Sequence, residues 1–349
     1  MSNDSNLIRV VVVDDSPTAR DLLVAIYESA GGLRVVGVGK TGADAVRLVR
    51  RLQPDVVSLD AVMPVLNGLE ATREIMRTRP TPIVIVTGSL MDTDRDVIFA
   101  ALQAGALAAA RKPGLDDPET SAQLVEKVRL MARVPVVRRW SHDRRPAAVP
   151  AIPRPAKAGR ASISLIGIAA STGGPSALAA TLKPLQRDFP VPILVVQHVA
   201  NGFADSLAAW LDGQIDLSVK LAGHGDPPKG GEVLLPPDDY HIQVNLDGLV
   251  ELSKAEPYKG LRPSANYLFH SLARAYGGRA VGVILTGMGD DGADGLQALH
   301  AAGGLVLAQE EKSCVVFGMP REAIVRGAAD QILSPEQIGA TLRQLVVQP

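Results

Sequence analysis

Residues 8–15 read IRVVVVDD, a run of β-branched side chains that ends in two aspartates. Such a run predicts a strand that is buried on both faces, because a strand with one solvent face alternates apolar and polar residues. Similar runs return four times further along the chain, each time after a stretch with helical period. These later runs are residues 34–38, 55–59, 83–86 and 106–110. Five strand–helix units in succession predict a doubly wound parallel α/β sheet.

A second series of strand and helix patterns begins near residue 163. Its apolar runs are residues 163–169, 193–197 and 281–285. Helical segments separate these runs, so we expect a second parallel α/β sheet, Rossmann-like in type. Residues 217–253 differ, being rich in Gly and Pro with short alternating runs at 232–235, 241–245 and 249–253. We interpret this segment as a small antiparallel insert.

Residues 134–160 interrupt both patterns. They hold five prolines and seven basic residues against one acidic residue, a net charge of +6. Proline and like charge favour a semi-extended linker over a packed core. We therefore divide the chain into a domain at 1–133, a linker at 134–160 and a second domain at 161–349.

Composition excludes several classes of protein. The 349 residues are 46% hydrophobic with a net charge of −1, enough apolar material for two cores. Residues 161–349 hold 13 basic and 19 acidic residues, a net charge of −6, which disfavours a DNA-binding regulator. Cys314 is the only cysteine, and no uninterrupted apolar run is long enough to span a membrane as a helix. We expect a soluble, cytoplasmic protein with no nucleic-acid partner and no membrane insertion.

The first domain carries polar residues where its predicted strands end. Asp14 and Asp15 follow the first strand, Asp60 the third, Thr87 the fourth and Lys112 the fifth. The carboxyl ends of parallel strands meet at one edge, so three carboxylates would converge and repel each other. Mg²⁺ suits such an all-oxygen site, and Asp60 would then be the nucleophile that accepts a phosphoryl group. Thr87 and Lys112 would supply donors to the phosphoryl oxygens.

This domain resembles the receiver domain of two-component response regulators, which has a flavodoxin-like fold. The resemblance rests on VVDDS at 12–16, LDAVMP at 59–64 with NG at 67–68, VTGS at 86–89 and KP at 112–113. It implies that a histidine kinase phosphorylates Asp60. One position departs from the family: receivers commonly carry an aromatic residue three before the lysine, and here that residue is Ala109.

The second domain carries a serine where its first strand turns into a helix. Ser171 is followed by Thr-Gly-Gly-Pro, which favours a tight turn with free backbone N–H groups. Such a turn suits either a bound phosphate or an oxyanion. A nucleophilic serine needs a base and an orienting carboxylate. His198 ends the next strand and Asp291 follows the strand at 281–285, so all three converge on one sheet edge.

The residues alone leave other interpretations open. A serine before Gly-Gly is most often a helix cap, and His198 is also consistent with a hydrogen-bonded residue at a strand end. His241 is the only other histidine that we place in the crevice. Neither the dinucleotide fingerprint nor a P-loop is present, and the loop after residue 290 lacks the ligands of an EF-hand.

Four motifs resemble the catalytic domain of the chemotaxis protein-glutamate methylesterases (CheB type) over residues 162–347. They are ASTGG at 170–174, QH at 197–198, RPS at 262–264 and LTGMGDDG at 285–292. The resemblance implies hydrolysis of glutamate γ-methyl esters on the cytoplasmic helices of chemoreceptors, with release of methanol, and also deamidation of receptor glutamines. It implies Ser171 as nucleophile, His198 as base and Asp291 as orienting residue, with Thr172 and Met288 supporting the oxyanion. No cofactor is implied for this hydrolysis.

The order of receiver, linker and esterase also matches that family. Three positions depart from its pattern: Asp290 and Asn266 replace the usual Asn and Asp, and Asn201 replaces a proline. We expect the unphosphorylated receiver to restrict access to Ser171 and phosphorylation of Asp60 to relieve the restriction. The competing hypothesis is a non-catalytic phosphorelay module whose second domain binds a partner or a nucleotide.

Overall fold

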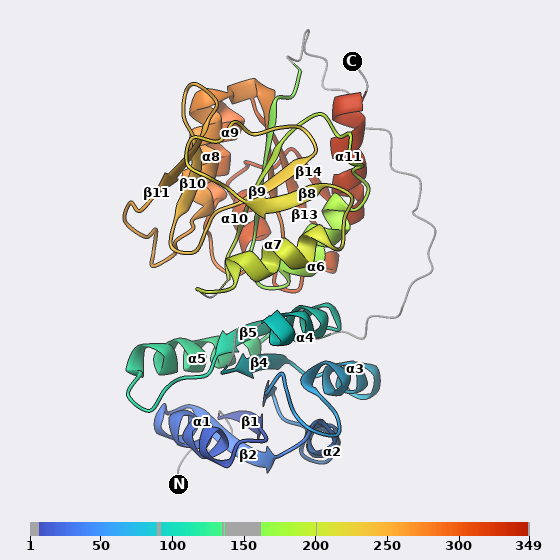
Figure 1. The fold of residues 1–349 in the computed structure, drawn as a ribbon, viewed down its shortest axis with the longest axis vertical. Helices are drawn as coiled ribbons and strands as arrows, with labels where there is room; N and C mark the ends of the chain where they lie inside the picture. Colours follow the sequence, from blue (N-terminus) through green and yellow to red (C-terminus); the bar gives the residue numbers. More distant parts are fainter. Residues whose placement is uncertain (1–6, 89–91, 135, 137–161, 200, 348–349) are drawn as a thin grey trace. The chain divides into compact units, whose positions relative to one another are not determined.

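The computed structural model describes residues 7–88, 92–134, 136, 162–199 and 201–347 (Figure 1). The chain divides into two compact units, which we call the N-terminal unit (Met1–Asp143) and the C-terminal unit (Arg144–Pro349). The predicted linker at 134–160 lies outside the described residues, apart from residues 134 and 136.

The N-terminal unit is one parallel sheet with the strand order β2-β1-β3-β4-β5. Its strands are β1 (Ile8–Val13), β2 (Leu33–Gly39), β3 (Val56–Leu59), β4 (Ile83–Thr87) and β5 (Ala108–Arg111). Its helices are α1 (Pro17–Ser29), α2 (Gly42–Leu52), α3 (Gly68–Thr78), α4 (Asp92–Gln103) and α5 (Pro118–Met131). Helices α1 and α5 cover one face and α2, α3 and α4 the other (Figure 1). The predicted doubly wound sheet is confirmed, and burial on both faces explains why β3 and β4 are apolar throughout most of their length.

The C-terminal unit is built on a seven-stranded sheet with the order β14-β13-β12-β6-β7-β9-β8, and its pairs are parallel. The strands are β6 (Leu165–Ala170), β7 (Ile193–Gln197), β8 (Ser218–Leu221), β9 (Glu232–Leu235), β12 (Ala280–Ile284), β13 (Leu305–Gln309) and β14 (Gln331–Leu333). The chain runs outward from β6 to one edge and then returns to β12 on the other side of β6. The strand order therefore reverses between β6 and β12, which is where sites form in doubly wound sheets.

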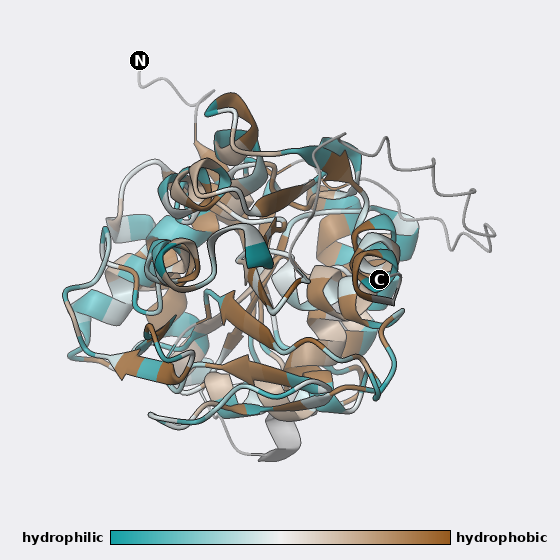
Figure 2. Ribbon diagram, turned by 90° about the horizontal axis from the view of Figure 1, so that it is seen from above, coloured by the Kyte–Doolittle hydropathy of each residue, from teal (hydrophilic) through white to brown (hydrophobic). Residues whose placement is uncertain are grey.

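Helices cover both faces of this sheet. The α-helices are α6 (Gly174–Leu182), α7 (Ala204–Asp212), α8 (Ala265–Ala275), α9 (Ala293–Ala301), α10 (Met319–Val325) and α11 (Pro335–Val347). Two short 3₁₀ turns are η2 (Gly277–Arg279) and η3 (Glu311–Ser313). Helices α8 and α9 lie on one face with α10, and α6 packs with α11 on the other (Figure 1). The strands are coloured predominantly as hydrophobic, while the helices carry both colours (Figure 2).

The insert at 217–253 differs in part from the prediction. Strands β10 (His241–Val244) and β11 (Val250–Ser253) form the expected antiparallel pair. Residues 232–235 do not belong to it, because β9 pairs in parallel with β7 and β8 in the main sheet. That part of the prediction is wrong: a short local pattern does not encode which distant strand it pairs with. Strands β13 and β14 also extend the sheet beyond the three strands predicted.

Candidate functional site

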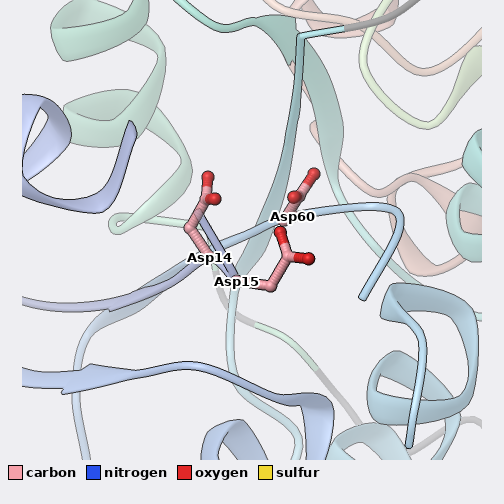
Figure 3. A group of neighbouring side chains, drawn as sticks. All are labelled: Asp14, Asp15 and Asp60. Atoms are coloured by element: carbon pink, nitrogen blue, oxygen red, sulfur yellow. The ribbon is translucent and has the colours of Figure 1, made fainter. Parts of the chain in front are cut away.

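Three aspartates gather at the carboxyl edge of the N-terminal sheet (Figure 3). Asp14 and Asp15 follow β1, and Asp60 follows β3, the neighbouring strand. One carboxylate oxygen from each lies within 4.8 Å of the others; Asp14 and Asp60 are buried and Asp15 is exposed. The parallel arrangement of the two strands thus brings together side chains that are far apart in the chain.

Lys112 lies between two of these carboxylates. Its Nζ is 2.8 Å from Oδ2 of Asp14 and 2.8 Å from Oδ2 of Asp60. Burial raises the pKa of Asp60 to about 6 against the opposing effect of the Lys112 ammonium, and the charge of Asp14 raises it further. One ammonium facing three carboxylates leaves an excess of negative charge, so this all-oxygen set fits a hard divalent cation.

Two further receiver positions lie on the neighbouring strands β4 and β5. Thr87 is buried at the end of β4, and its carbonyl accepts a 2.7 Å hydrogen bond from the Lys112 N–H, which fixes the two strand ends side by side. Ala109 lies on β5, where its carbonyl accepts a 3.0 Å hydrogen bond from Nζ of Lys127 on α5. Ser89, the last residue of the predicted VTGS motif, lies outside the described residues.

The loop after Asp60 depends on a glycine. Asn67 caps α3 in a capping box with Glu70, which fixes where the helix begins. The next residue, Gly68, lies so close to Asp60 that a Cβ would be 2.4 Å from the Asp60 carbonyl oxygen. The Asn-Gly pair therefore holds the backbone of Asp60 against the start of α3.

Ser171 and His198 lie on neighbouring strand ends of the C-terminal sheet. The His198 N–H donates to the carbonyl of Ala170 over 3.0 Å, and the Ser171 N–H donates to the carbonyl of Thr286 over 3.0 Å. The Ser171 hydroxyl makes no hydrogen bond within the part of the chain that the structure describes. The backbones are adjacent, but the hydrogen bond from serine to histidine is not formed in this structure.

His198 is joined to Asp291. Its Nε2 lies 2.8 Å from Asp291 Oδ2, and both side chains are largely buried. The same carboxylate accepts hydrogen bonds from the Ser264 hydroxyl (2.6 Å) and from the Ala265 N–H (2.6 Å) at the start of α8. Burial alone raises the pKa of Asp291, but the hydrogen bonds from His198, Ser264 and Ala265 outweigh it and hold the pKa below its usual value. Asp291 is therefore an anion at neutral pH, placed at a helix N-terminus.

His241 contacts Ser264, one of the residues that hydrogen-bond to Asp291. It is fully buried, its Nδ1 accepts the Ser264 N–H over 3.1 Å, and its ring stacks on Tyr267 with 3.8 Å between ring centroids. Burial lowers the pKa of His241, which matches a neutral ring that accepts at Nδ1. His241 therefore contacts the residue that orients Asp291 and is not an alternative base in the crevice.

The turn after Ser171 leaves backbone donors free. Gly173 has φ +77, and a Cβ there would lie 2.5 Å from the Val315 side chain, so only glycine fits. The backbone N–H groups of Thr172 and Met288 donate to no residue in the described ranges. Gly287 lies against Ser171, since a Cβ on Gly287 would be 2.8 Å from the Ser171 Cβ. Thr172 and Met288 thus flank Ser171 with unused donors.

Two of the departures from the family pattern have clear contacts. Asp290 is paired with Lys259 (2.6 Å) and lies 3.4 Å from Arg326, so its charge is balanced locally. The Asn266 Oδ1 accepts the N–H groups of Gly292 (3.1 Å) and Gly295 (2.8 Å) at the start of α9. The amide oxygen of Asn266 serves this capping role as a carboxylate oxygen would. The Asn266 Nδ2 is buried without a hydrogen-bond partner among the described residues.

Sequence reasoning missed several residues that shape the site. Ser264 and Gln197 appeared only as parts of quoted motifs, and Thr286 carried no role. Thr286 is buried and its Oγ1 donates to the Thr172 carbonyl over 2.9 Å. No spacing rule in the sequence reveals these contacts, because each joins segments that lie far apart in the chain.

The two units define a class of protein: a response regulator whose output unit has the residues of a serine hydrolase. Comparison with family models agrees, since residues 10–126 match the response regulator receiver domain and residues 166–342 match the CheB methylesterase model. The chain belongs to the CheB methylesterase family. It is therefore a protein-glutamate methylesterase, a carboxylic ester hydrolase of chemotaxis signalling that carries a receiver domain.

Relatives cover nearly the whole chain. A protein-glutamate methylesterase/protein-glutamine glutaminase of Myxococcus xanthus is 46% identical over 98% of this chain and 97% of its own length. One from Nitrosospira multiformis is 43% identical over 98% of each chain. The crystal structure of the Thermotoga maritima CheB methylesterase catalytic domain superposes with a TM-score of 0.51 at 38% identity, covering 53% of this chain and all of that one. These relatives favour the hydrolase over the binding-module and DNA-binding alternatives.

In the described residues, no helix is long and apolar enough to cross a membrane.

Proposed function

We propose that Ser171, His198 and Asp291 are the catalytic triad of this methylesterase. The observation that carries the proposal is the 2.8 Å contact between His198 Nε2 and Asp291 Oδ2, on the strand ends that flank the Ser171 strand. A serine hydroxyl is a weak nucleophile at neutral pH, so it needs a neighbouring base, and the base needs an anion to stabilise its charged form.

The orientation of the imidazole decides which nitrogen acts as the base. Asp291 occupies Nε2, so the proton on that nitrogen is held by the carboxylate and Nδ1 is left to accept the Ser171 proton. In chymotrypsin-like enzymes the carboxylate pairs with Nδ1 instead. In this proposal Ser171 approaches Nδ1, because Nε2 is engaged by Asp291 and the His198 backbone is hydrogen-bonded to Ala170, the residue before Ser171.

The reaction then proceeds in two acyl-transfer steps. Ser171 Oγ attacks the ester carbonyl while its proton moves to His198 Nδ1, and that proton then leaves with methanol. Water attacks the acyl-enzyme by the reverse route and releases a glutamate carboxylate. The free N–H groups of Thr172 and Met288 stabilise the oxyanion of each tetrahedral intermediate. A glutamine side chain follows the same route with ammonia as the leaving group.

In the N-terminal unit, Asp60 is the proposed phosphoryl acceptor. Asp14, Asp15 and Asp60 would hold Mg²⁺, which when bound neutralises charge between the carboxylates and the incoming phosphoryl group. Lys112 stands 2.8 Å from Asp60 and Thr87 ends the neighbouring strand, so both are proposed to donate to phosphoryl oxygens. A phosphoryl group adds about −1.5 to −2 charge. We propose that this added charge relieves a restriction that the unphosphorylated receiver places on access to Ser171.

The proposed partners follow from these chemistries. A chemotaxis-type histidine kinase donates the phosphoryl group in the cytoplasm, and the cytoplasmic helices of methyl-accepting chemoreceptors present the methyl esters.

The test is methanol release from methylated receptor membranes, with and without Mg²⁺ plus a small phosphodonor. Ser171→Ala and His198→Ala are expected to lower turnover by on the order of 10³-fold or more. Ser162→Ala is the matched control, because Ser162 is exposed just before the same strand. A loss of tenfold or less in Ser171→Ala would show that Ser171 is not the nucleophile. If phosphodonor leaves wild-type turnover unchanged, the coupling to Asp60 is wrong.

A further inference from the structure

Gln197 connects the two strand ends that carry Ser171 and His198. It is the last residue of β7 and is only 4% exposed. Its Nε2 donates to the carbonyl of Ser171 over 2.8 Å and to the carbonyl of His198 over 3.0 Å. One amide group therefore uses both of its N–H bonds on the backbones of the proposed nucleophile and the proposed base.

The other end of the same amide has no partner. Gln197 Oε1 is buried and accepts no hydrogen bond from the residues that the structure describes. Leaving a buried acceptor unpaired costs folding free energy, so stability by itself would not select an amide at this position. What the side chain contributes is its two donated hydrogen bonds, to the carbonyls of Ser171 and His198.

The neighbouring helix leaves room for this amide. A Cβ on Gly174, the first residue of α6, would lie 1.8 Å from Gln197 Oε1 and 2.7 Å from its Cδ. Alanine suits a helix better than glycine does, and the backbone of Gly174 is not in the left-handed region. The Gln197 amide is the closest obstacle to a larger residue at 174, and the Ala170 Cβ, 2.9 Å away, is the next. A Cβ at 174 would push the amide away from its two carbonyls.

We propose that Gln197 is a positioning residue for ester hydrolysis, which sets the backbone of Ser171 against that of His198. The inference rests on the triad proposed above and extends it. Catalytic groups need placement within a fraction of an ångström, and a misplacement of about 1 Å can cost about 10²-fold in rate. Without the amide, the Ser171 carbonyl keeps its 2.8 Å bond from the Gly174 N–H, while the link to His198 is lost. The backbone bond from the His198 N–H to the Ala170 carbonyl (3.0 Å) still pairs the two strands, but the carbonyls of Ser171 and His198 are no longer held by one group.

The experiment measures kcat and KM for methanol release by the full-length protein with methylated receptor membranes. The variants are Gln197→Ala, Gly174→Ala and the double variant. Each single change is expected to lower kcat by about 10²-fold with KM within about threefold, because placement of the reacting groups changes while substrate contacts do not. The double variant is expected to lose clearly less than the two single losses combined, since the added methyl group then has no amide to displace and meets only the Ala170 Cβ.

Ser271→Ala is the structural control. Ser271 is equally buried, and its hydroxyl joins α8 to β10 by accepting the Val244 N–H over 3.0 Å. Thermal melts should show a comparable loss of stability in the control with kcat unchanged. If Gln197→Ala does not melt cooperatively, Gln197→Met fills the same volume without donors and is tested in its place.

Three results would overturn the proposal. They are a kcat within threefold of wild type in a folded Gln197 variant, fully additive losses in the double variant, or failure of both Gln197 variants to fold. Ser171→Ala runs alongside: if it retains turnover, the triad itself fails, whatever the Gln197 variants show.

Discussion

Replacing Ser264 by alanine tests how the fold holds the carboxylate of Asp291, the proposed orienting residue. The Ser264 hydroxyl donates to Asp291 Oδ1 over 2.6 Å and accepts the Asn266 N–H over 3.2 Å as the N-cap of α8. Ser264 is fully buried, so water cannot take over either bond. Loss of an N-cap costs about 0.5–2 kcal/mol and loss of a hydrogen bond to a charged group about 1.5–3 kcal/mol. Because one hydroxyl makes both bonds, we expect the free energy of unfolding to fall by about 3 kcal/mol.

The effect on turnover should be smaller than that of removing a member of the proposed triad. Asp291 keeps the N–H of Ala265 at 2.6 Å and that of Asn266 at 3.2 Å, so it remains an anion and still faces His198. We therefore expect kcat in Ser264→Ala to fall by about tenfold, compared with on the order of 10³-fold for Ser171→Ala.

The free energy of unfolding is measured by chemical denaturation, with hydrogen exchange of peptides from the C-terminal unit as the readout. The kcat for methanol release is measured on the same preparations. Ser271→Ala, a buried hydroxyl on the same helix, is expected to lose similar stability and no turnover. Unchanged stability in Ser264→Ala would refute the account of the helix N-terminus. A loss of 10³-fold in kcat would refute the claim that the two backbone N–H groups suffice to hold Asp291.

Three other predictions concern single groups. The pKa of Asp291 is lowered, so the stabilisation that its carboxylate gives the fold is present at neutral pH and is lost as the pH falls below 3.8. In urea denaturation, the difference in the free energy of unfolding between wild type and Asp291→Asn should therefore shrink in acid, and a constant difference would contradict this. Burial raises the pKa of Cys314 to about 12, so little thiolate is present at pH 8. Alkylation of Cys314 at pH 8, followed by mass spectrometry, should be slower by about 10³-fold than in the urea-unfolded chain. Equal rates would show an accessible thiolate. Tyr27→Phe leaves the buried Ser58 hydroxyl without its 2.9 Å hydrogen-bond partner. Hydrogen exchange should show the free energy of unfolding of the N-terminal unit falling by about 1–2 kcal/mol. Tyr267→Phe, a change in the other unit, should leave the N-terminal unit unaffected.

Local pattern was sufficient for much of the fold. The β-branched runs ending at Val13, Leu59 and Gln197 appear in the structure as strands with the same last residues. Buried parallel strands must be apolar on both faces, so their composition identifies them without knowledge of their neighbours. The same local pattern could not assign β9 to the main sheet, because pairing depends on long-range register and not on the residues of the strand themselves.

The sequence by itself determined which residues reach the functional edges. Asp14, Asp60, Ser171, His198 and Asp291 each follow a recognisable strand, and parallel strands place their carboxyl ends together.

Only the tertiary structure decided how those residues are held. It assigned Nε2 of His198 to Asp291, made Ser264 and His241 the support of that carboxylate, and placed the Gln197 amide between two strand ends. These contacts join segments that are widely separated along the chain, and hydrogen bonds require distances of about 3 Å. Sequence spacing carries no such distance, which is fixed only when the sheet and its covering helices pack together.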